Sequence, residues 1–165
     1  MKEKFIEECR VLRQNCTYTA ETHYAMANHY RRRALGFQLV PTVIAALSSA
    51  GATIWGASEV ILVLTLGSSI VAAVATVLNP NRAYQEHLNA ARGFTILKHD
   101  ARFLAEAEST CLSDDAFVER VRNLHEKYSA LVASAPATAR KFFEKAREVV
   151  QAGIHEPDRE AGAIK

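Results

Sequence analysis

Two long uncharged segments constrain the fold of this chain more than any other feature. No charged side chain occurs in the twenty-five residues 34–58 or in the twenty-two residues 60–81, and only Glu59 separates them. A helix of about 20 apolar residues crosses a hydrocarbon layer about 30 Å thick, so each segment is long enough to span a bilayer. Backbone polar groups in lipid must be bonded within the segment, and two spans cannot close a barrel, so we expect helices.

These segments predict a transmembrane helical hairpin, with spans at 36–56 and 60–78 and a turn between them. The alternative is a pair of core helices in a soluble bundle, although such helices rarely stay uncharged on every face over this length. Overall composition hides the pattern, because 49% hydrophobic residues and a net charge of +2 are typical of a soluble domain. The nearly neutral charge argues against nucleic acid as a partner. Thirty-three polar or amphipathic residues precede the first apolar segment, so we expect no cleaved signal peptide.

Arginines flank the hairpin at the ends of the spans that are distant from the turn. Arg31, Arg32 and Arg33 precede the first span, Arg82 follows the second, and the turn contains neither Lys nor Arg. The positive-inside rule therefore predicts a multi-pass membrane protein with both termini in the cytoplasm. The same arginines alternatively hold a nucleotide phosphate or an anionic lipid headgroup.

Small and polar side chains form a stripe at four-three spacing along each span. The polar members are Gln38, Thr42, Ser49 and Thr53 in the first span, and Thr65, Ser69, Thr76 and Asn79 in the second. Stripes of this kind let transmembrane helices approach closely and hydrogen-bond to each other. Alternatively, part of them lines a polar path, which needs several protomers because two helices enclose nothing. Pro41 predicts a kink in the first span, since it lacks an N–H and crowds the carbonyl of Phe37.

Heptad-like seams predict amphipathic helices on both sides of the hairpin. In residues 3–33 the seam is formed by Phe5, Cys9, Leu12, Cys16, Thr19, His23, Met26 and Tyr30. Asn79 and Pro80 predict a new helix start, and its seam contains Ala83, His87, Ala90, Phe94, Leu97, Ala101, Leu104, Glu108 and Cys111. Residues 113–115 predict the cap of a further helix with Phe117, Val121, Leu124, Tyr128 and Leu131 on its seam, and Pro136 precedes a last helix that ends at Gly153.

The predicted fold is therefore an all-α integral membrane protein. We expect a long amphipathic N-terminal helix in the cytosol over residues 1–33, the transmembrane hairpin over 34–81, a cytosolic helical bundle over 82–152 and a disordered tail over 153–165. The seams carry more apolar surface than one chain is expected to cover, so we predict a homo-oligomer with Phe94 and Leu97 in its seam.

Nothing in the sequence indicates catalysis or a bound metal. The three cysteines and six histidines show no CxxC or HxxxH spacing. Paired carboxylates, a glycine-rich phosphate loop and a nucleophile–base pair are also missing from the sequence. We therefore expect neither an enzyme nor a cofactor.

Several short motifs carry a family resemblance. They are His29-Tyr30-Arg31 before the first span, Leu78-Asn79-Pro80-Asn81-Arg82 after the second, and the stretches 87–91 and 94–97 in the following helix. Together with the layout over about residues 5–150, they resemble the SLATT family of two-transmembrane effectors in bacterial nucleotide-second-messenger conflict systems. The resemblance implies an antiviral effector that oligomerises and permeabilises or depolarises the inner membrane, with a sensor protein or cyclic nucleotide as its upstream signal. The alternative is a membrane-anchored scaffold or regulator without pore activity.

Overall fold

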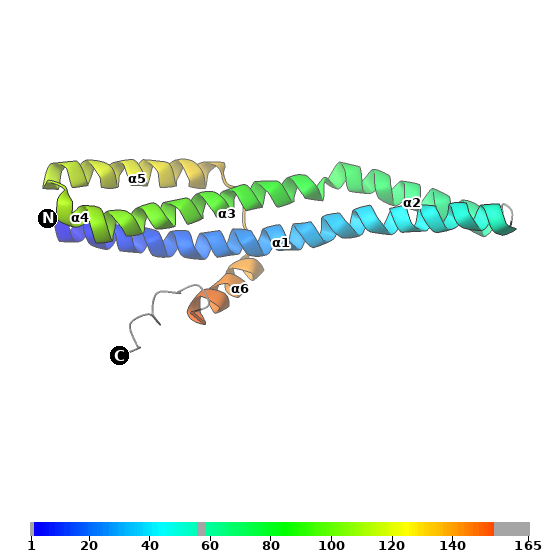
Figure 1. Ribbon diagram of the computed structural model, residues 1–165, viewed down its shortest axis with the longest axis horizontal. Helices are drawn as coiled ribbons and strands as arrows, with labels where there is room; N and C mark the ends of the chain where they lie inside the picture. The colour runs from blue at the N-terminus through cyan, green and yellow to red at the C-terminus, as the bar shows by residue number, and fades with distance from the viewer. Residues whose placement is uncertain (1, 56–58, 154–165) are drawn as a thin grey trace. The chain divides into compact units, whose positions relative to one another are not determined.

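The computed structural model describes residues 2–55 and 59–153, and every regular element in these ranges is a helix. In chain order they are α1 (Lys2–Trp55), α2 (Glu59–Leu78), α3 (Pro80–Phe103), the π-helical turn η1 (Leu104–Glu108), α4 (Ser109–Cys111), α5 (Asp114–Ser134) and α6 (Arg140–Gln151) (Figure 1). The predicted all-α fold is confirmed. The turn was predicted over residues 56–59; Glu59 is instead the first residue of α2, and residues 56–58 and the predicted tail beyond Gly153 lie outside the described residues.

Contacts divide the chain into two compact units. Residues 1–26 and 86–165 form one, here called the bundle unit, and residues 27–85 form the other, here called the hairpin unit. The predicted domain boundaries at 33/34 and 81/82 lie a few residues away from this division. The N-terminal amphipathic segment and the first apolar segment belong to one continuous helix, α1.

Residues of the predicted seams form most of the core of the bundle unit; the exception is Ala20, which is buried beside the half-buried Thr19 that the seam predicted. The core residues are Cys9, Leu12, Cys16 and Ala20 of α1, Ala90, Phe94, Leu97 and Ala101 of α3, Leu104 of η1, and Phe117, Val121 and Leu124 of α5. Phe94 and Phe117 are among the largest fully buried side chains. Burial of the apolar stripes of several helices against one another is the main favourable term in such a fold.

The predicted seam of α3 is wrong at its C-terminal end, where Cys111 is exposed. The reason is the π-helical turn Leu104–Glu108, which inserts an extra residue into the helical path. One residue corresponds to about 100° of rotation around a helix with 3.6 residues per turn, so the following side chains leave the core face.

The helix ends in the bundle unit follow local signals only in part. Ser113 precedes α5 as predicted, but its side chain makes no capping bond; its carbonyl instead accepts the N–H of Phe117 at 2.9 Å. α6 begins at Arg140, four residues after Pro136, because the backbone at Ala135 and at Ala139 is extended. Gly153 has φ +70° just past the end of α6, which confirms the predicted stop.

Asn79 connects α2 to α3. Its φ of +39° ends α2, and asparagine tolerates this left-handed region better than most side chains. Its side-chain oxygen accepts the N–H of Arg82 at 3.2 Å and so caps α3. The predicted helix start at Pro80 is confirmed. α1 is helical on both sides of Pro41, and a kink there stays a prediction.

Candidate functional site

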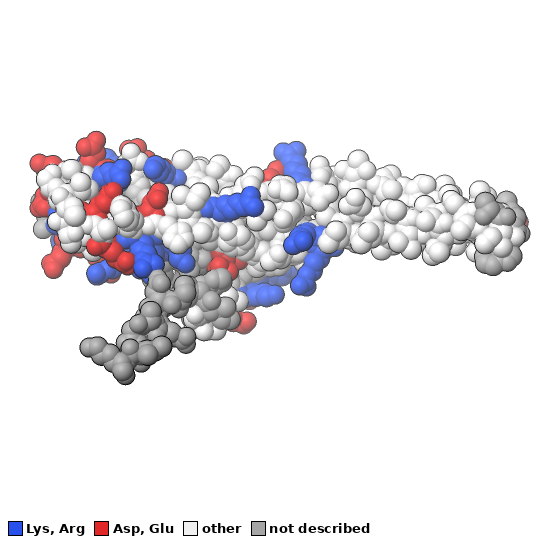
Figure 2. All heavy atoms as spheres, in the orientation of Figure 1, with Lys and Arg blue, Asp and Glu red and all other residues white. Residues whose placement is uncertain are grey.

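The outer surface of the hairpin unit is apolar. Leucine, isoleucine and valine side chains are exposed along both of its helices, for example Leu47 by 68%, Leu62 by 72% and Val77 by 85%. On the face drawn in Figure 2, most of the described atoms along this length are white, that is, neither Lys, Arg, Asp nor Glu. A soluble monomer rarely exposes an apolar surface of this extent, so this one must be covered by lipid or by protein.

Two helical stretches are long and apolar enough to cross a membrane, one in Lys2–Ala52 and one in Glu59–Cys111. Only 22% and 6% of their most apolar windows are buried inside the chain. The core helices of a soluble bundle would be mostly buried within their own chain. The alternative interpretation of the two segments as core helices therefore does not fit this structure.

The side chains that are buried along the two apolar helices of the hairpin unit, α1 and α2, are small. In α1 the buried positions include Ala34, Pro41 and Ser48, which are seven residues apart, and in α2 the buried residue is Ser68. Small residues allow close approach of helices, and a seven-residue repeat keeps one line of contact. We call these four residues the hairpin contact line. The seven-residue spacing of Ala34, Pro41 and Ser48 could have predicted this buried face from the sequence, but the predicted stripe used the polar residues beside it.

The predicted polar stripe of α1 lies beside the contact line. Thr42 and Ser49 each follow a contact-line residue directly, and both are exposed. Thr65, Ser69 and Thr76 of α2 are exposed as well. Their hydroxyls donate to carbonyls of their own helix: Thr42 to Gln38 at 2.6 Å, Thr65 to Ile61 at 2.8 Å, Ser69 to Thr65 at 3.0 Å and Thr76 to Ala72 at 3.0 Å. These bonds satisfy the hydroxyls without any partner helix.

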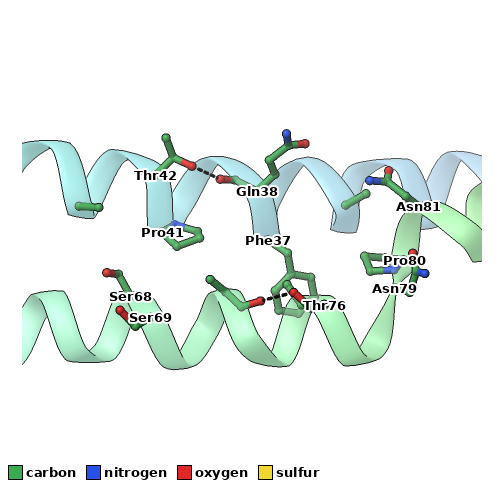
Figure 3. A pocket seen from close by; sticks show the side chains of 14 residues that line it. Phe37, Gln38, Pro41, Thr42, Ser68, Ser69, Thr76, Asn79, Pro80 and Asn81 are labelled. Atoms are coloured by element: carbon green, nitrogen blue, oxygen red, sulfur yellow. Dashed lines mark hydrogen bonds between the residues drawn. The ribbon is translucent and has the colours of Figure 1, made fainter.

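A pocket of about 590 Å³ lies within the hairpin unit, between α1 and α2. Phe37 and Pro41 of α1 point toward α2, and Ser68 and Ser69 of α2 point toward α1 (Figure 3). Five of the eight polar residues predicted for the stripes line it: Gln38, Thr42, Ser69, Thr76 and Asn79. Ser49 and Thr65 are not among its lining residues, and the side chain of Thr53 lies outside the described part. Whether the polar residues of the two stripes line a polar path or only pack the helices stays a prediction.

Arginines are sequence neighbours of two residues that line this pocket, one on α1 and one on α3. Arg31, Arg32 and Arg33 are exposed and directly precede the lining residue Ala34, and the exposed Arg82 directly follows the lining residue Asn81. Glu59 is the only acidic residue between positions 27 and 85. The charged residues that adjoin the pocket in the sequence are therefore all positive.

The bundle unit contains a buried histidine pair that the sequence analysis did not join. The Nδ1 atoms of His23 and His87 are 2.9 Å apart, and both side chains are buried. The ring of His23 also stacks on Phe94, with centroids 5.7 Å apart. Each histidine lay on a predicted seam, but pairing them needs the register between α1 and α3.

Burial keeps this pair uncharged at neutral pH. Burial and, as the smaller cause, the neighbouring His87 together lower the pKa of His23 to about 4. Burial also lowers the pKa of His87, against the opposing effect of Glu86. One neutral ring therefore donates its Nδ1–H to the bare Nδ1 of the other.

The buried cysteines are packing residues. Cys9 and Cys16 are free thiols on the predicted seam, and burial raises the pKa of each to about 11, with a smaller contribution from Glu8 at Cys9. A thiol that stays protonated at pH 7 is a poor nucleophile and a poor metal ligand. Within residues 2–55 and 59–153 there is no group of three or more His, Cys, Asp or Glu side chains that could hold a metal ion.

Phe94 and Leu97 lie inside the bundle unit's own core, with exposures of 1% and 5%. A change at either position would therefore disturb the fold of one chain as well as any assembly. Homo-oligomerisation through these residues stays a prediction.

An apolar two-helix hairpin joined to a polar helical bundle defines a class of all-helical proteins with two candidate membrane spans. Residues 3–155 match the family described as SMODS and SLOG-associating 2TM effector domain family 4, so the chain belongs to the SLATT family that its motifs resemble. The family description links it to SMODS and SLOG components and hence to an upstream signal. Comparison with curated proteins and with solved structures finds no match.

Proposed function

We propose that this protein is a membrane effector of a bacterial antiviral conflict system. In this proposal the hairpin unit spans the inner membrane, and oligomers of it permeabilise or depolarise that membrane when an upstream signal reaches the bundle unit. The observation that carries the proposal is the exposed apolar surface of the hairpin unit, together with membership of a two-transmembrane effector family.

The charges support a defined topology. Arg31–Arg33 and Arg82 would lie at the cytoplasmic surface, and the uncharged segment near residues 56–58 would face outward. Both termini, and with them the bundle unit, would then be cytoplasmic, where they can meet a sensor protein or a cyclic nucleotide.

Exposed polar groups on the apolar surface support assembly. A single hairpin encloses no path, and Ser49 and Thr65 are exposed among leucines and valines. Polar side chains in membranes preferentially face other helices or water rather than lipid. In an oligomer such positions would be covered or would line the path.

The second candidate is an anchored scaffold or regulator, which one observation favours. The stripe hydroxyls at 42, 65, 69 and 76 already bond to their own backbone, so they need neither a pore nor a partner. A scaffold would use the hairpin only to hold the bundle unit at the membrane.

Dye leakage from proteoliposomes at rising protein density separates the two candidates, because density drives oligomerisation by mass action. The effector should release dye above a threshold density. Ser49→Leu together with Thr65→Leu should reduce release while cross-linked oligomers persist, because the change removes polar lining. Val63→Leu with Val74→Leu is the matched control on exposed apolar positions. If wild-type protein releases no dye at any density, the effector proposal is contradicted and the anchored scaffold is favoured.

A further inference from the structure

The hairpin pocket has an amphipathic lining. Its apolar wall includes Phe37, Pro41 and Ala72, and its polar part includes the side chains of Asn79 and Asn81. The volume of about 590 Å³ falls within the range of about 300–1,000 Å³ that small-molecule sites occupy. A ligand that fits such a lining has an apolar part and a polar part.

The charge next to the pocket specifies the polar part of the ligand. Helical side chains at i and i+3 or i+4 share a face, so Arg31 lies one turn before Ala34, and Arg33 one turn before Phe37. Both Ala34 and Phe37 line the pocket. Side chains lean toward the helix N-terminus, which directs these guanidinium groups to the side away from the span. That end of the site suits an anion, and guanidinium pairs well with phosphate.

Exposed leucines adjoin the lining residues of the pocket in the sequence. Leu35 and Leu39 alternate with lining residues on α1, and Leu78 precedes the lining residue Asn79; all three leucines are exposed. In the topology proposed above they would lie at the inner edge of the hydrocarbon layer. A ligand that reaches the pocket through them comes from the bilayer.

We propose that this pocket binds one anionic phospholipid of the inner leaflet. Its headgroup phosphate pairs with the arginines at 31–33 and 82, and part of an acyl chain lies along Phe37 and Pro41. This inference rests on the membrane insertion of the hairpin proposed above. The bound lipid would fill the pocket beside the contact-line residues Ala34, Pro41 and Ser68, which also line it.

Native mass spectrometry of the full-length protein in detergent tests the site, with phosphatidylglycerol as the probe and phosphatidylcholine as the neutral comparison. Wild-type protein should retain one phosphatidylglycerol and release phosphatidylcholine. The triple change Arg31→Gln, Arg32→Gln and Arg33→Gln should weaken retention about fivefold for each cation removed. Arg140→Gln, Lys141→Gln and Arg147→Gln on α6 remove the same charge from the bundle unit and should leave retention unchanged.

A charge-neutral pair of variants tests the pocket itself. Ala72→Leu fills a lining position, whereas Ala73→Leu adds the same bulk at an exposed position that does not line the pocket. Only Ala72→Leu should lower retention. Equal retention in both, equal retention of the two lipids, or displacement of the lipid by millimolar inorganic phosphate would overturn the proposal.

Alkaline extraction of membranes separates this test from that of the proposed function. Protein that stays in the membrane but retains no phosphatidylglycerol contradicts the lipid site alone. Protein that is washed off the membrane contradicts insertion, and with it both proposals.

Discussion

The bundle unit and the hairpin unit use the same helical periodicity with opposite chemistry. The bundle unit buries large apolar side chains such as Phe94 and Phe117 and exposes most of its charges. The hairpin unit buries small residues such as Ala34 and Ser48 and exposes leucines and valines. In water, burial of large apolar side chains drives folding. In lipid, helices associate through small residues that allow close approach. The contrast supports the proposal that the bundle unit lies in water and the hairpin unit in lipid.

Polar contacts differ in the same way. In the bundle unit, ion pairs join different helices, for example Arg13 with Glu106 at 3.1 Å and Arg120 with Glu108 at 2.9 Å. In the hairpin unit, the stripe hydroxyls bond to their own helix. Exposed ion pairs each contribute at most about 1 kcal/mol, so the apolar core remains the main source of stability in the bundle unit.

The largest effect is expected from a charge in the core of the bundle unit. Phe94→Lys should unfold the bundle unit, because an unpaired buried ammonium costs several kcal/mol. Leu62→Lys, at an exposed hairpin position, should leave the melting of the bundle unit unchanged. Circular dichroism melts in detergent measure both. Native melting of Phe94→Lys with loss of oligomers would mean that Phe94 contacts another chain instead.

A smaller effect is expected from acidification. His23 and His87 have a lower pKa when folded than the ordinary 6.5, so the unfolded chain binds more protons as the pH falls below about 7. The bundle unit should therefore lose stability from about pH 7 toward pH 4, where the folded His23 also becomes protonated, for a total of a few kcal/mol. Urea titrations at several pH values measure this slope.

The control for the histidine pair removes its titration. His23→Gln combined with His87→Gln should have a flatter pH dependence than wild type, and His99→Gln, at an exposed position, should not. Identical slopes for the double variant and wild type between pH 7 and pH 5 would mean that the pair does not carry the effect.

Adjacent serines sharpen the contrast within the hairpin unit. Ser48 is buried, and its hydroxyl oxygen makes no hydrogen bond among the described residues, whereas Ser49 is exposed. Ser48→Leu should overpack the contact line and cost about 1–3 kcal/mol, and Ser49→Leu should cost almost nothing in one hairpin. Helix pairing is measured in detergent as the efficiency of a disulfide cross-link between α1 and α2 at rising temperature. Equal losses for the two variants would contradict the contact line.

The smallest effect is expected at the junction of α2 and α3. Asn79→Ala should destabilise by about 1 kcal/mol, because alanine neither caps α3 nor tolerates φ +39° as well. Asn81→Ala, two residues further on and inside α3, is the control. Asn79→Gly should be milder than Asn79→Ala, and the reverse order in detergent melts would mean that the backbone angle is unimportant here.

The sequence predicted the features that depend on local spacing. Cys9, Leu12, Phe117 and Val121 were placed on seams by their periodicity, and Asn79-Pro80 marked a helix start. The π-helical turn at Leu104–Glu108 has no such signal, because it trades one hydrogen-bond pattern for another within a continuous helical segment.

The features that depend on register between helices were not predicted. The contact line through Pro41 and Ser48 was not predicted, because the predicted stripe runs through the neighbouring hydroxyl residues Thr42 and Ser49. The His23–His87 pair joins positions 64 residues apart, and only the packing of α1 on α3 brings them together. The pocket likewise needs the separation of α1 and α2, which no spacing encodes.

Labelling with a membrane-impermeant maleimide tests most directly whether the hairpin spans the membrane. The chain provides its own reference for the proposed topology, in which the bundle unit is cytoplasmic, because Cys111 is exposed in that unit, while Cys9 and Cys16 are buried thiols. In intact cells that carry Ser58→Cys, the new cysteine should be labelled and Cys111 should react only after the membrane is opened. Labelling of Cys111 in intact cells, or labelling of Ser58→Cys only after lysis, would contradict a hairpin that crosses the membrane with its turn outside.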